Sequence, residues 1–540
     1  MGFKIVEDRP TPPEVYNWRI YMTGVIIAFG AALFGYCASD QVIDVGFISF
    51  IGTALKLPAF QRDFNLASDS PDNANIISVF QAGAFFASMA AYPTMENFGR
   101  KKTLIGTAAL FNVGCILQIA ATHQIGLIYA GRVVVGIAVG FVTTCCPVYL
   151  AELSPPAIRG RLVGFYEMAY QIMALVAFWL SYGIKQHMDL SSSVTWRIPF
   201  GLQLVPGGLL LIGCFFLKES PRYLLKRHRP EEATHNLCWL RMLPASHTYI
   251  EEELSATVVQ INREKEVTAG YRGNAAMRYL RGMWHEVSTP GIRNRIVIGA
   301  FIMMWQNMSG INSINYYSPT LFASLGVEDT SLYTGIYGVL KAAASIFFFV
   351  FLVDTWGRRP PLMFGAITSG LCLLYVAVYL QVADPASQAV VSSSTHMGGQ
   401  AAIAFLFLFS IFYCMGWNGL AWVVCAEIYP TRIRALCAAW TSCHQWLWQF
   451  IIARETPDML NSRMGVSGTF FLFTACNLLS AVFVYFFIPE TKGRTLEDMD
   501  AIFGLVRPVD NASKAETQQV EDAHKIKDVG KPQQHAEDAV

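Results

Sequence analysis

The heptapeptide Glu96–Lys102, ENFGRKK, follows an apolar stretch, and a similar heptapeptide, DTWGRRP (354–360), follows another apolar stretch far along the chain. A second pair of motifs, AELSPPAIRGR (151–161) and AEIYPTRIRA (426–435), recurs in the same order. One basic loop alone is usually only a signal that stops membrane insertion. Two pairs in register indicate that each half of the chain is a copy of one unit. Their acidic and Arg side chains can latch helix ends together on one face of a membrane.

Long apolar stretches recur along the whole chain of 540 residues, which is 53% apolar and only 15% charged. Soluble domains are about a quarter charged, and each stretch is close to the ~20 residues that a bilayer-crossing helix needs. We therefore expect an all-α membrane protein with twelve transmembrane helices in two six-helix bundles. The expected spans are 20–39, 75–93, 103–122, 125–149, 163–185, 197–217, 294–318, 332–353, 361–382, 401–425, 435–453 and 468–488.

The distribution of Lys and Arg predicts the orientation. Basic residues occupy alternate short loops, whereas the loops at 319–331 and 383–400 contain none. The positive-inside rule then places both termini and the central polar segment in the cytoplasm. The expected segments are a cytoplasmic N-terminus (1–19), an N-terminal bundle (20–217), cytoplasmic linker helices (218–293), a C-terminal bundle (294–489) and a mostly disordered cytoplasmic tail (490–540).

Parallel repeats of this kind are typical of secondary transporters, whose substrate site lies near the bilayer midplane. The chain contains no CxxC or metal-ligand spacing, and no nucleophile–base pair or phosphate-binding loop is recognisable. We therefore expect no enzyme activity, no catalytic residue, no metal and no cofactor. A formal net charge of +1 gives no reason to expect a nucleic-acid partner. The 12 cysteines lie mostly in apolar stretches, which favours small buried thiols over disulfides.

Polar residues gather at one depth of several expected spans. The stretch Trp305–Pro319, WQNMSGINSINYYSP, is the densest example. A helix rises about 1.5 Å per residue and the apolar core is about 30 Å thick, so ten residues from a cytoplasmic end reach the middle of the membrane. Four spans place an amide or an indole near that depth: Gln171 (ten after Arg161), Gln306 (eleven after Arg295), Gln445 (eleven after Arg434) and Trp422 (eight before Pro430).

Two interpretations of these polar residues remain open. Asn, Gln and Ser side chains hydrogen-bond packed helices together, for about 1 kcal/mol each. Alternatively, a cluster from both halves receives a polyhydroxyl solute, because each hydroxyl that leaves water needs a new partner. Lys341 adds a charge, about 20 Å above the cytoplasmic face, since it lies thirteen residues before Asp354. Either its stem reaches the outer interface or its ammonium meets the carboxylate of an acidic substrate.

The chain resembles the sugar-porter family of the major facilitator superfamily over about residues 15–500. The resemblance rests on RVVVGIAVGFVTTCCPVYLAELSPPAIRG (132–160), KESPRYLL (218–225), both Gly-Arg loops and PETKGRTLED (489–498). Three further stretches look most like the branch that carries quinate and sugar acids: VEDRPTPPEVYNWRIY (6–21), WQNMSGINSINYYSPTLF (305–322) and GIYGVLK (335–341).

The resemblance implies roles for particular residues. Asn307 stands where many family members have a second Gln, and GWNGLAW (416–422) lacks the usual prolines, so a hinge there would rest on Gly416 and Gly419. The substrate-binding residues that it implies, together with Lys341 beside a substrate position, are Gln171, Gln306, Asn307, Asn312, Lys341, Trp422, Gln445 and Gln449. The residues expected to form a cytoplasmic gate are Glu96, Arg100, Glu152, Arg159, Asp354, Arg358, Glu427 and Arg434.

Proton coupling is expected to involve Arg132 and an acid in the first span. The proton-coupled branch of the family has Gly-Tyr-Asp there, but this chain reads FGYCASD (34–40), with Cys37 at the acidic position and roughly ten extra residues after it. Asp40, nearly one helical turn on, is the candidate replacement, and Asp44 is a poorer one. The other explanation is that the extra residues are an artefact such as a retained intron.

We therefore expect a plasma-membrane secondary transporter that works by alternating access. Its expected cargo is quinate or a similar polyhydroxy or sugar acid, taken up together with a proton. One alternative is a carrier of neutral hexoses or pentoses. Another, from a different class, is a nutrient sensor that binds without transporting. Such sensors tend to have long signalling tails, and only about 50 residues follow position 490.

Overall fold

The computed structural model describes residues 11–38, 58–66, 71–155, 158–269, 284–285, 287–325, 330–383, 393–430, 433–492 and 503. Apart from short connections, these residues are helical. The first half contains α1 (Trp18–Ala38), α3 (Pro58–Phe64), α4 (Pro71–Phe98), α5 (Arg100–Ile119), α6 (Ile125–Leu153), α7 (Arg159–His187), α8 (Val194–Leu202) and α9 (Leu204–Phe216).

In its described part, the polar segment that links the halves contains α10 (Pro221–Lys226), α11 (Pro230–Arg241) and α12 (Thr248–Ala269). The helices of the second half are α14 (Pro290–Met308), α15 (Ile311–Ser324), α16 (Thr330–Phe347), the π-helix η3 (Phe348–Leu352), α17 (Val353–Trp356), α18 (Arg359–Ala383), α19 (Ser393–Gly416), α20 (Leu420–Ile428), α21 (Arg434–Asn461) and α22 (Gly465–Phe487).

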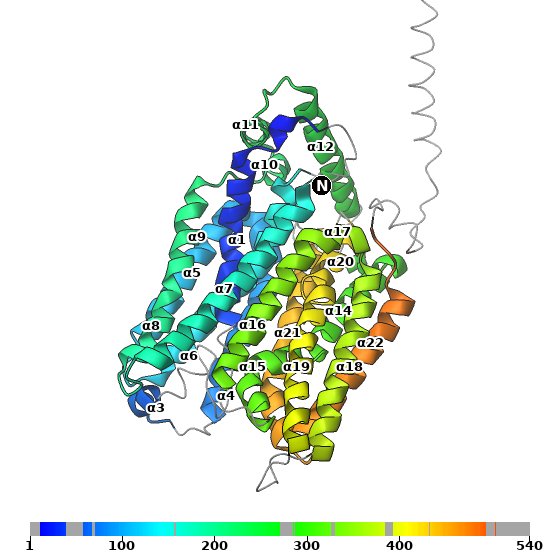
Figure 1. Ribbon diagram of the computed structural model, residues 1–540. Helices are drawn as coiled ribbons and strands as arrows, with labels where there is room; N and C mark the ends of the chain where they lie inside the picture. The colour runs from blue at the N-terminus through cyan, green and yellow to red at the C-terminus, as the bar shows by residue number, and fades with distance from the viewer. Residues whose placement is uncertain are drawn as a thin grey trace, which may run out of the picture.

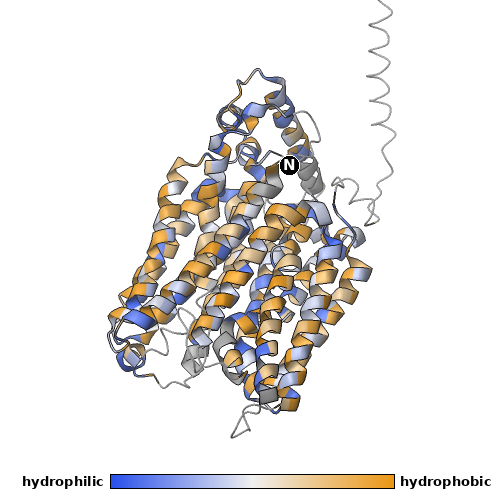
Figure 2. Cartoon of the chain, in the orientation of Figure 1, coloured by the Kyte–Doolittle hydropathy of each residue, from blue (hydrophilic) through white to orange (hydrophobic). Residues whose placement is uncertain are grey.

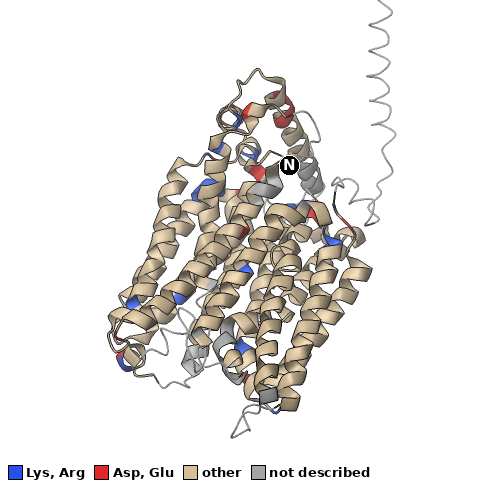
Figure 3. Cartoon of the chain, in the orientation of Figure 1, with Lys and Arg blue, Asp and Glu red and all other residues tan. Residues whose placement is uncertain are grey.

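The two halves form two bundles that lie side by side, and helices α10–α12 lie at the end where α1 begins (Figure 1). Apolar residues cover the length of both bundles, whereas the linker helices are more polar (Figure 2). Charged residues gather mostly toward the two ends (Figure 3). Within the described ranges, eight helical stretches are long and apolar enough to cross a membrane by length and composition. With α4, α7, α14–α15 and α21 they make the twelve spans expected from the sequence.

Several expected spans are interrupted rather than continuous. The seventh is divided into α14 and α15 at Ser309–Gly310, and the tenth into α19 and α20 at residues 417–419. The sixth consists of α8 and α9, which meet at Gln203, and the eighth contains the π-helix. Broken helices are tolerated in membranes where neighbouring groups satisfy the freed backbone. Periodicity and hydropathy do not reveal such breaks, because the residues around them are still largely apolar.

The cysteines behave as the sequence predicts: all 12 are free thiols, and Cys238 alone among them is not buried. Each bundle has its own apolar core, one built from α14–α22 and the other from the helices of the first half. Trp446 of α21 crosses between them, because it packs within the core of the N-terminal bundle.

Within the N-terminal bundle, α4 and α6 approach closely at a small residue. A Cβ atom added to Gly136 of α6 would lie 2.2 Å from the carbonyl oxygen of Phe80 on α4. Small residues at such crossings let two backbones pack directly against each other.

Substituting Gly136 with Ala is therefore expected to lower the melting temperature of the detergent-solubilised protein by about 1–3 °C. The helices must separate, and overpacking of this kind typically costs about 1–3 kcal/mol. Gly106 is the matched control, because a Cβ there would meet nothing within 4 Å. Gly106→Ala should change the melting temperature by less than about 1 °C. Equal melting temperatures for the two variants would contradict the close approach.

Candidate functional site

The break between α14 and α15 uses several polar residues of the stretch Trp305–Pro319. Gly310 has φ +91°, a conformation that glycine adopts readily. The Ser309 hydroxyl donates to the carbonyl oxygen of Gln306 at 2.7 Å, and Asn477 of α22 donates to that of Ser309 at 2.8 Å. These side chains satisfy backbone groups that a continuous helix would satisfy itself. This part of the stretch therefore serves the helix break.

Gln306 connects the first break to the second, between α19 and α20. Its Nε2 donates to the carbonyl oxygens of Trp417 at 3.0 Å and of Asn418 at 2.6 Å. Its Oε1 is buried and has no hydrogen-bond partner among the described residues. The Trp417 indole donates to the carbonyl oxygen of Leu362 on α18 at 3.0 Å. Gln306 therefore holds the α19–α20 break and keeps an acceptor atom available.

Across the bundle boundary, a carboxylate on α7 faces the same break. Glu167 Oε1 accepts a hydrogen bond from Asn418 Nδ2 at 2.6 Å and another from Gln171 Nε2 at 3.0 Å. Asn418 Nδ2 also donates to the Ser345 hydroxyl of α16 at 3.1 Å. Gln171, Glu167, Asn418 and Gln306 thus form one chain of contacts from α7 to α14.

A second chain of amides joins α14, α15 and α21. Asn307 Nδ2 donates to Gln445 Oε1 at 2.9 Å and to the carbonyl oxygen of Met303 at 2.7 Å. Asn312 Nδ2 donates to Asn307 Oδ1 at 2.5 Å. Because Gln306 and Asn307 are neighbours in sequence, the two chains meet on α14.

The ammonium of Lys341 lies beside these amides. Its Nζ donates to Asn315 Oδ1 of α15 at 3.4 Å, and the Tyr337 hydroxyl donates to the same oxygen at 3.4 Å. Lys341 is 9% exposed and interacts electrostatically with Glu167. The two residues do not form a direct ion pair in the described part of the chain. The buried position does not fit the interpretation that the stem of Lys341 reaches the outer membrane interface.

The structure brings together most, but not all, of the expected substrate residues. Trp422 is partly buried on α20, and its described contacts are with the apolar core of the C-terminal bundle. Gln449 is buried on α21, one helical turn beyond Gln445. The expected residues that are joined through the amide contacts or Asn315 are Gln171, Gln306, Asn307, Asn312, Lys341 and Gln445.

Arg132, the basic member of the expected proton pair, is fully buried on α6. Its Nε donates to the carbonyl oxygen of Ile76 at 3.4 Å, and its guanidinium lies 4.6 Å from the ring centroid of Phe80 on α4. Asp40, the expected acidic member, lies outside the described residues. The pair therefore stays a prediction.

A tryptophan ties the two bundles together. The Trp446 indole donates to the Thr143 hydroxyl of α6 at 3.2 Å. Its ring makes edge contacts with Phe34 of α1 and Phe80 of α4, at centroid distances of 5.2 and 5.7 Å. This aromatic cluster adjoins Tyr170, whose ring centroid is 4.7 Å from that of Phe34. An aromatic wall therefore lies at the bundle boundary, one residue from Gln445.

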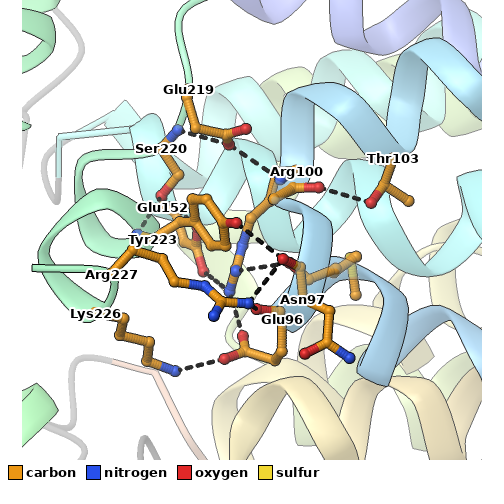
Figure 4. Close-up of polar contacts among 12 residues, drawn as sticks. Glu96, Asn97, Arg100, Thr103, Glu152, Glu219, Ser220, Tyr223, Lys226 and Arg227 are labelled. Carbon is orange, nitrogen blue, oxygen red and sulfur yellow. Dashed lines mark hydrogen bonds and ion pairs between the residues drawn. The ribbon is translucent and has the colours of Figure 1, made fainter. Parts of the chain in front are cut away.

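The repeated motif in the first half forms a buried ion cluster (Figure 4). The Arg100 guanidinium donates to Glu96 at 2.7 Å and to Glu152 at 2.8 Å, and its side chain is 1% exposed. Lys226 of α10 donates to the other oxygen of Glu96 at 3.0 Å, and the Ser220 hydroxyl donates to Glu152 at 2.5 Å. The linker is therefore attached to the ends of α4, α5 and α6.

The second half repeats this arrangement. The Arg358 guanidinium donates to both carboxylate oxygens of Glu427, at 2.8 to 3.2 Å, and Thr491 donates to the same carboxylate. The Arg358 side chain is 13% exposed and is therefore less buried than that of Arg100. The two Arg–Glu pairs each lie within one bundle. They therefore fasten helix ends inside each half, as the repeated motifs predict.

Each half also caps a helix N-terminus with a carboxylate. Glu219 accepts backbone N–H bonds from Arg100 and Lys101 of α5, and Glu490 accepts them from Arg358 and Arg359. Burial raises the pKa of Glu219 more than these bonds lower it. At Glu490 burial is outweighed by the backbone bonds and Arg358, which lower the pKa of that carboxyl. Glu490 is therefore the more firmly charged of the two caps.

Three expected gate residues are described less completely. Arg434 is the first residue of α21 and is partly buried. The side chains of Arg159 and Asp354 lie outside the described part of the structure. The gate as a functional unit stays a prediction.

Three residues of the site were not expected from the sequence: Glu167, Asn418 and Trp446. Glu167 carried a usable signal, because an acidic residue inside an expected span is costly and is often functional. It lies only six residues after Arg161, which is short of the ten that reach the middle of the membrane. Asn418 and Trp446 offered no such signal, since their partners come from other helices.

Comparison with known proteins gives a consistent result. A model of the "Sugar (and other) transporter" family matches residues 23–503. A probable quinate permease of Neosartorya fischeri is 43% identical over 513 residues, which are 92% of this chain and 90% of the relative. A quinate permease of Neurospora terricola is 42% identical over 521 residues, covering 94% and 93% of the two chains.

The fold has been seen before as well. The proton:xylose symporter XylE, a major facilitator superfamily protein solved with 6-bromo-6-deoxy-D-glucose, superimposes with a TM-score of 0.73 and 24% identity. The match covers 90% of this chain and 99% of XylE, which confirms the fold of two six-helix bundles. The family match over most of the chain confirms a transporter rather than an enzyme. This protein belongs to the sugar transporter family and is a multi-pass membrane transporter.

Proposed function

We propose that the protein carries quinate or a similar polyhydroxy acid across the plasma membrane, together with a proton. The two bundles would expose the site alternately to either side of the membrane. Relatives at 41–43% identity over most of the chain are named as quinate permeases, which supports this substrate class.

The observation that carries the proposal is the position of Lys341. A buried ammonium is costly unless it meets a partner. Its described hydrogen bond goes to Asn315 Oδ1, a neutral amide oxygen at the long distance of 3.4 Å. A substrate carboxylate would supply a partner of opposite charge, which is what a buried ammonium normally has.

The amides of α7, α14, α15 and α21 suit the remaining groups of such a substrate. Each hydroxyl that leaves water needs both a donor and an acceptor. Gln306 Oε1 is an acceptor that is buried without a described partner, and Gln445 is an amide with both capacities. We assign substrate binding to Gln306, Asn307, Asn312, Gln445 and Lys341, with Gln171, Trp422 and Gln449 as outer members of the same site.

Alternating access needs parts that move and parts that stay fixed. The helix breaks at 309–310 and 417–419 lie next to the amides, so substrate contacts can bias the positions of α15 and α20. The Arg–Glu pairs keep the helix ends of each half together, which lets the halves move as units. In this proposal the termini and α10–α12 face the cytoplasm, the domain limits follow the helix bounds, and the eight expected gate residues close the cytoplasmic side.

A carrier of neutral monosaccharides is the second candidate. It is favoured by the number of uncharged amides, because those alone would suit a neutral sugar. In a carrier of neutral sugars, however, the charge of Lys341 would have no role.

Uptake of radiolabelled quinate, galacturonate and glucose into transport-deficient yeast tests the proposal. We expect saturable uptake of quinate, or of galacturonate, that exceeds glucose uptake at least about tenfold, since one charge-assisted hydrogen bond contributes about 1.5–3 kcal/mol. A protonophore should abolish accumulation above the external concentration.

A fluorescent tag on the C-terminus reports whether the protein reaches the plasma membrane, and cells with the empty vector give the background. Glucose uptake that equals or exceeds acid uptake would favour the neutral-sugar candidate. Binding of quinate without any uptake would favour the sensor.

A further inference from the structure

A carboxylate at the bundle boundary is not among the residues to which the proposed function assigns substrate binding. Glu167 lies on α7, is partly exposed within the structure, and both of its described hydrogen bonds reach Oε1. Its Oε2 has no hydrogen-bond partner among the described residues. An acidic side chain in a membrane span usually serves transport of protons, ions or substrate.

We propose that Glu167 is the residue that binds the coupled proton, at Oε2, and that it does so inside the substrate site. This inference rests on the proposed function and names the coupling residue for it. It also explains how the chain can couple protons although position 37 is a cysteine.

The charged surroundings of Glu167 explain why binding of a proton would strengthen binding of an acidic substrate, and the reverse. Lys341 on α16 is the charged group that acts on Glu167 in the described part of the chain. The other titratable neighbours are Tyr166 and Tyr170 on α7 and Tyr413 and Cys414 on α19, and they are neutral near pH 7.

With Glu167 ionised, its charge offsets that of Lys341, and the site repels a second carboxylate. With Glu167 protonated, Lys341 leaves one net positive charge for the substrate anion. Proton binding and anion binding therefore strengthen each other, and by linkage the effect is reciprocal. A neutral sugar would gain nothing from that protonation.

Glu167 also touches the element expected to move. Asn418, which donates to Oε1, lies in the break between α19 and α20. A Cβ added to Gly419 would lie 3.2 Å from Glu167 Cγ and 2.3 Å from Phe349 in the π-helix. The α19–α20 break therefore packs directly against the Glu167 side chain. A change of charge on Glu167 alters the strength of its bond to Asn418, because bonds to a carboxylate are the stronger ones.

Calorimetric titration of the purified full-length protein with quinate, in buffers of different ionisation enthalpy, counts the protons taken up per quinate bound. At pH 7.5 we expect about one proton for the wild type and none for Glu167→Gln. Glu167→Asp keeps a carboxyl group and should restore at least half of the uptake. Between pH 6.5 and 7.5 the wild-type affinity should fall by up to about tenfold, whereas that of Glu167→Gln should change less than about twofold.

Glu455→Gln is the matched control, because Glu455 is an exposed carboxylate near the far end of α21. It should take up as many protons as the wild type. Glutamine has nearly the shape of glutamate and can still accept from Asn418, and thermal melting verifies that the variant is folded. Wild-type proton uptake by Glu167→Gln would overturn the inference, as would a wild type that takes up none. Absence of quinate binding by the wild type would overturn the proposed function instead.

Discussion

We expect that replacing Lys341 with Met will reduce the proposed quinate uptake by about 100-fold. The substrate carboxylate then enters a site in which no ammonium meets it, and truncating one partner of a buried charge pair costs about 2–5 kcal/mol. Met preserves most of the volume of the aliphatic stem, so packing against α7 and α15 is largely retained. Initial uptake rates in yeast, normalised to the amount of protein at the cell surface, provide the measurement.

Lys341→Arg is the comparison variant, because it keeps the charge and changes the shape. It should retain at least ten times the activity of Lys341→Met. Where a neutral sugar is also carried, Lys341→Met should reduce its uptake by less than about threefold. Equal loss of acid and sugar uptake would show that Lys341 supports the structure rather than the substrate charge.

We expect that replacing Arg100 with Gln will destabilise the protein by about 3–5 kcal/mol and lower transport at least tenfold. Glu96 and Glu152 would then be left with no guanidinium between them, in a place where the Arg100 side chain is 1% exposed. Removing one partner of a buried ion pair leaves an uncompensated charge. The melting temperature in detergent and the uptake per surface molecule both report the effect.

The second half provides a graded comparison. Arg358→Gln should be less destabilising, because the side chains of Arg358 and Glu427 are 13% and 30% exposed and water can replace part of the lost interaction. Lys102→Gln removes a positive charge from an exposed position in the first turn of α5, two residues after Arg100, and should leave both readouts unchanged. A larger loss at Arg358 than at Arg100, or equal behaviour of Arg100→Gln and Lys102→Gln, contradicts this account.

Several features could be predicted from the sequence because they depend on local chemistry. Apolar length predicts the spans, and the repeated Gly-Arg loops predict the two halves. The ion pairs of Arg100 and Arg358 follow from the same repeat, since each motif brings its acid and its base to the same helix ends. The distances of Gln306 and Gln445 from the cytoplasmic ends of their spans also predict that they lie at one depth, and both take part in the described amide contacts.

Other features could not be predicted because they depend on neighbours from distant parts of the chain. Glu167 was passed over, although it is visible in the sequence, because its distance from Arg161 says nothing about which helix it faces. The role of Gln306 in holding the α19–α20 break depends on the carbonyl oxygens of Trp417 and Asn418, more than 100 positions away. Trp422 was expected in the site from its depth and from the family resemblance, but depth does not determine which side of a helix a residue occupies, and its described contacts are with the apolar core.

By itself, then, the amino-acid sequence determined a duplicated membrane protein with polar groups at mid-depth and a lysine among them. Hydropathy and charge placement decide these features, because the cost of burying a charge in lipid acts on every residue separately. Only the tertiary structure decided that α7 presents Glu167 to the break in the tenth span and places it within electrostatic reach of Lys341. Helix packing determines this orientation, because contacts with all of its neighbours together fix the rotation of each helix about its axis.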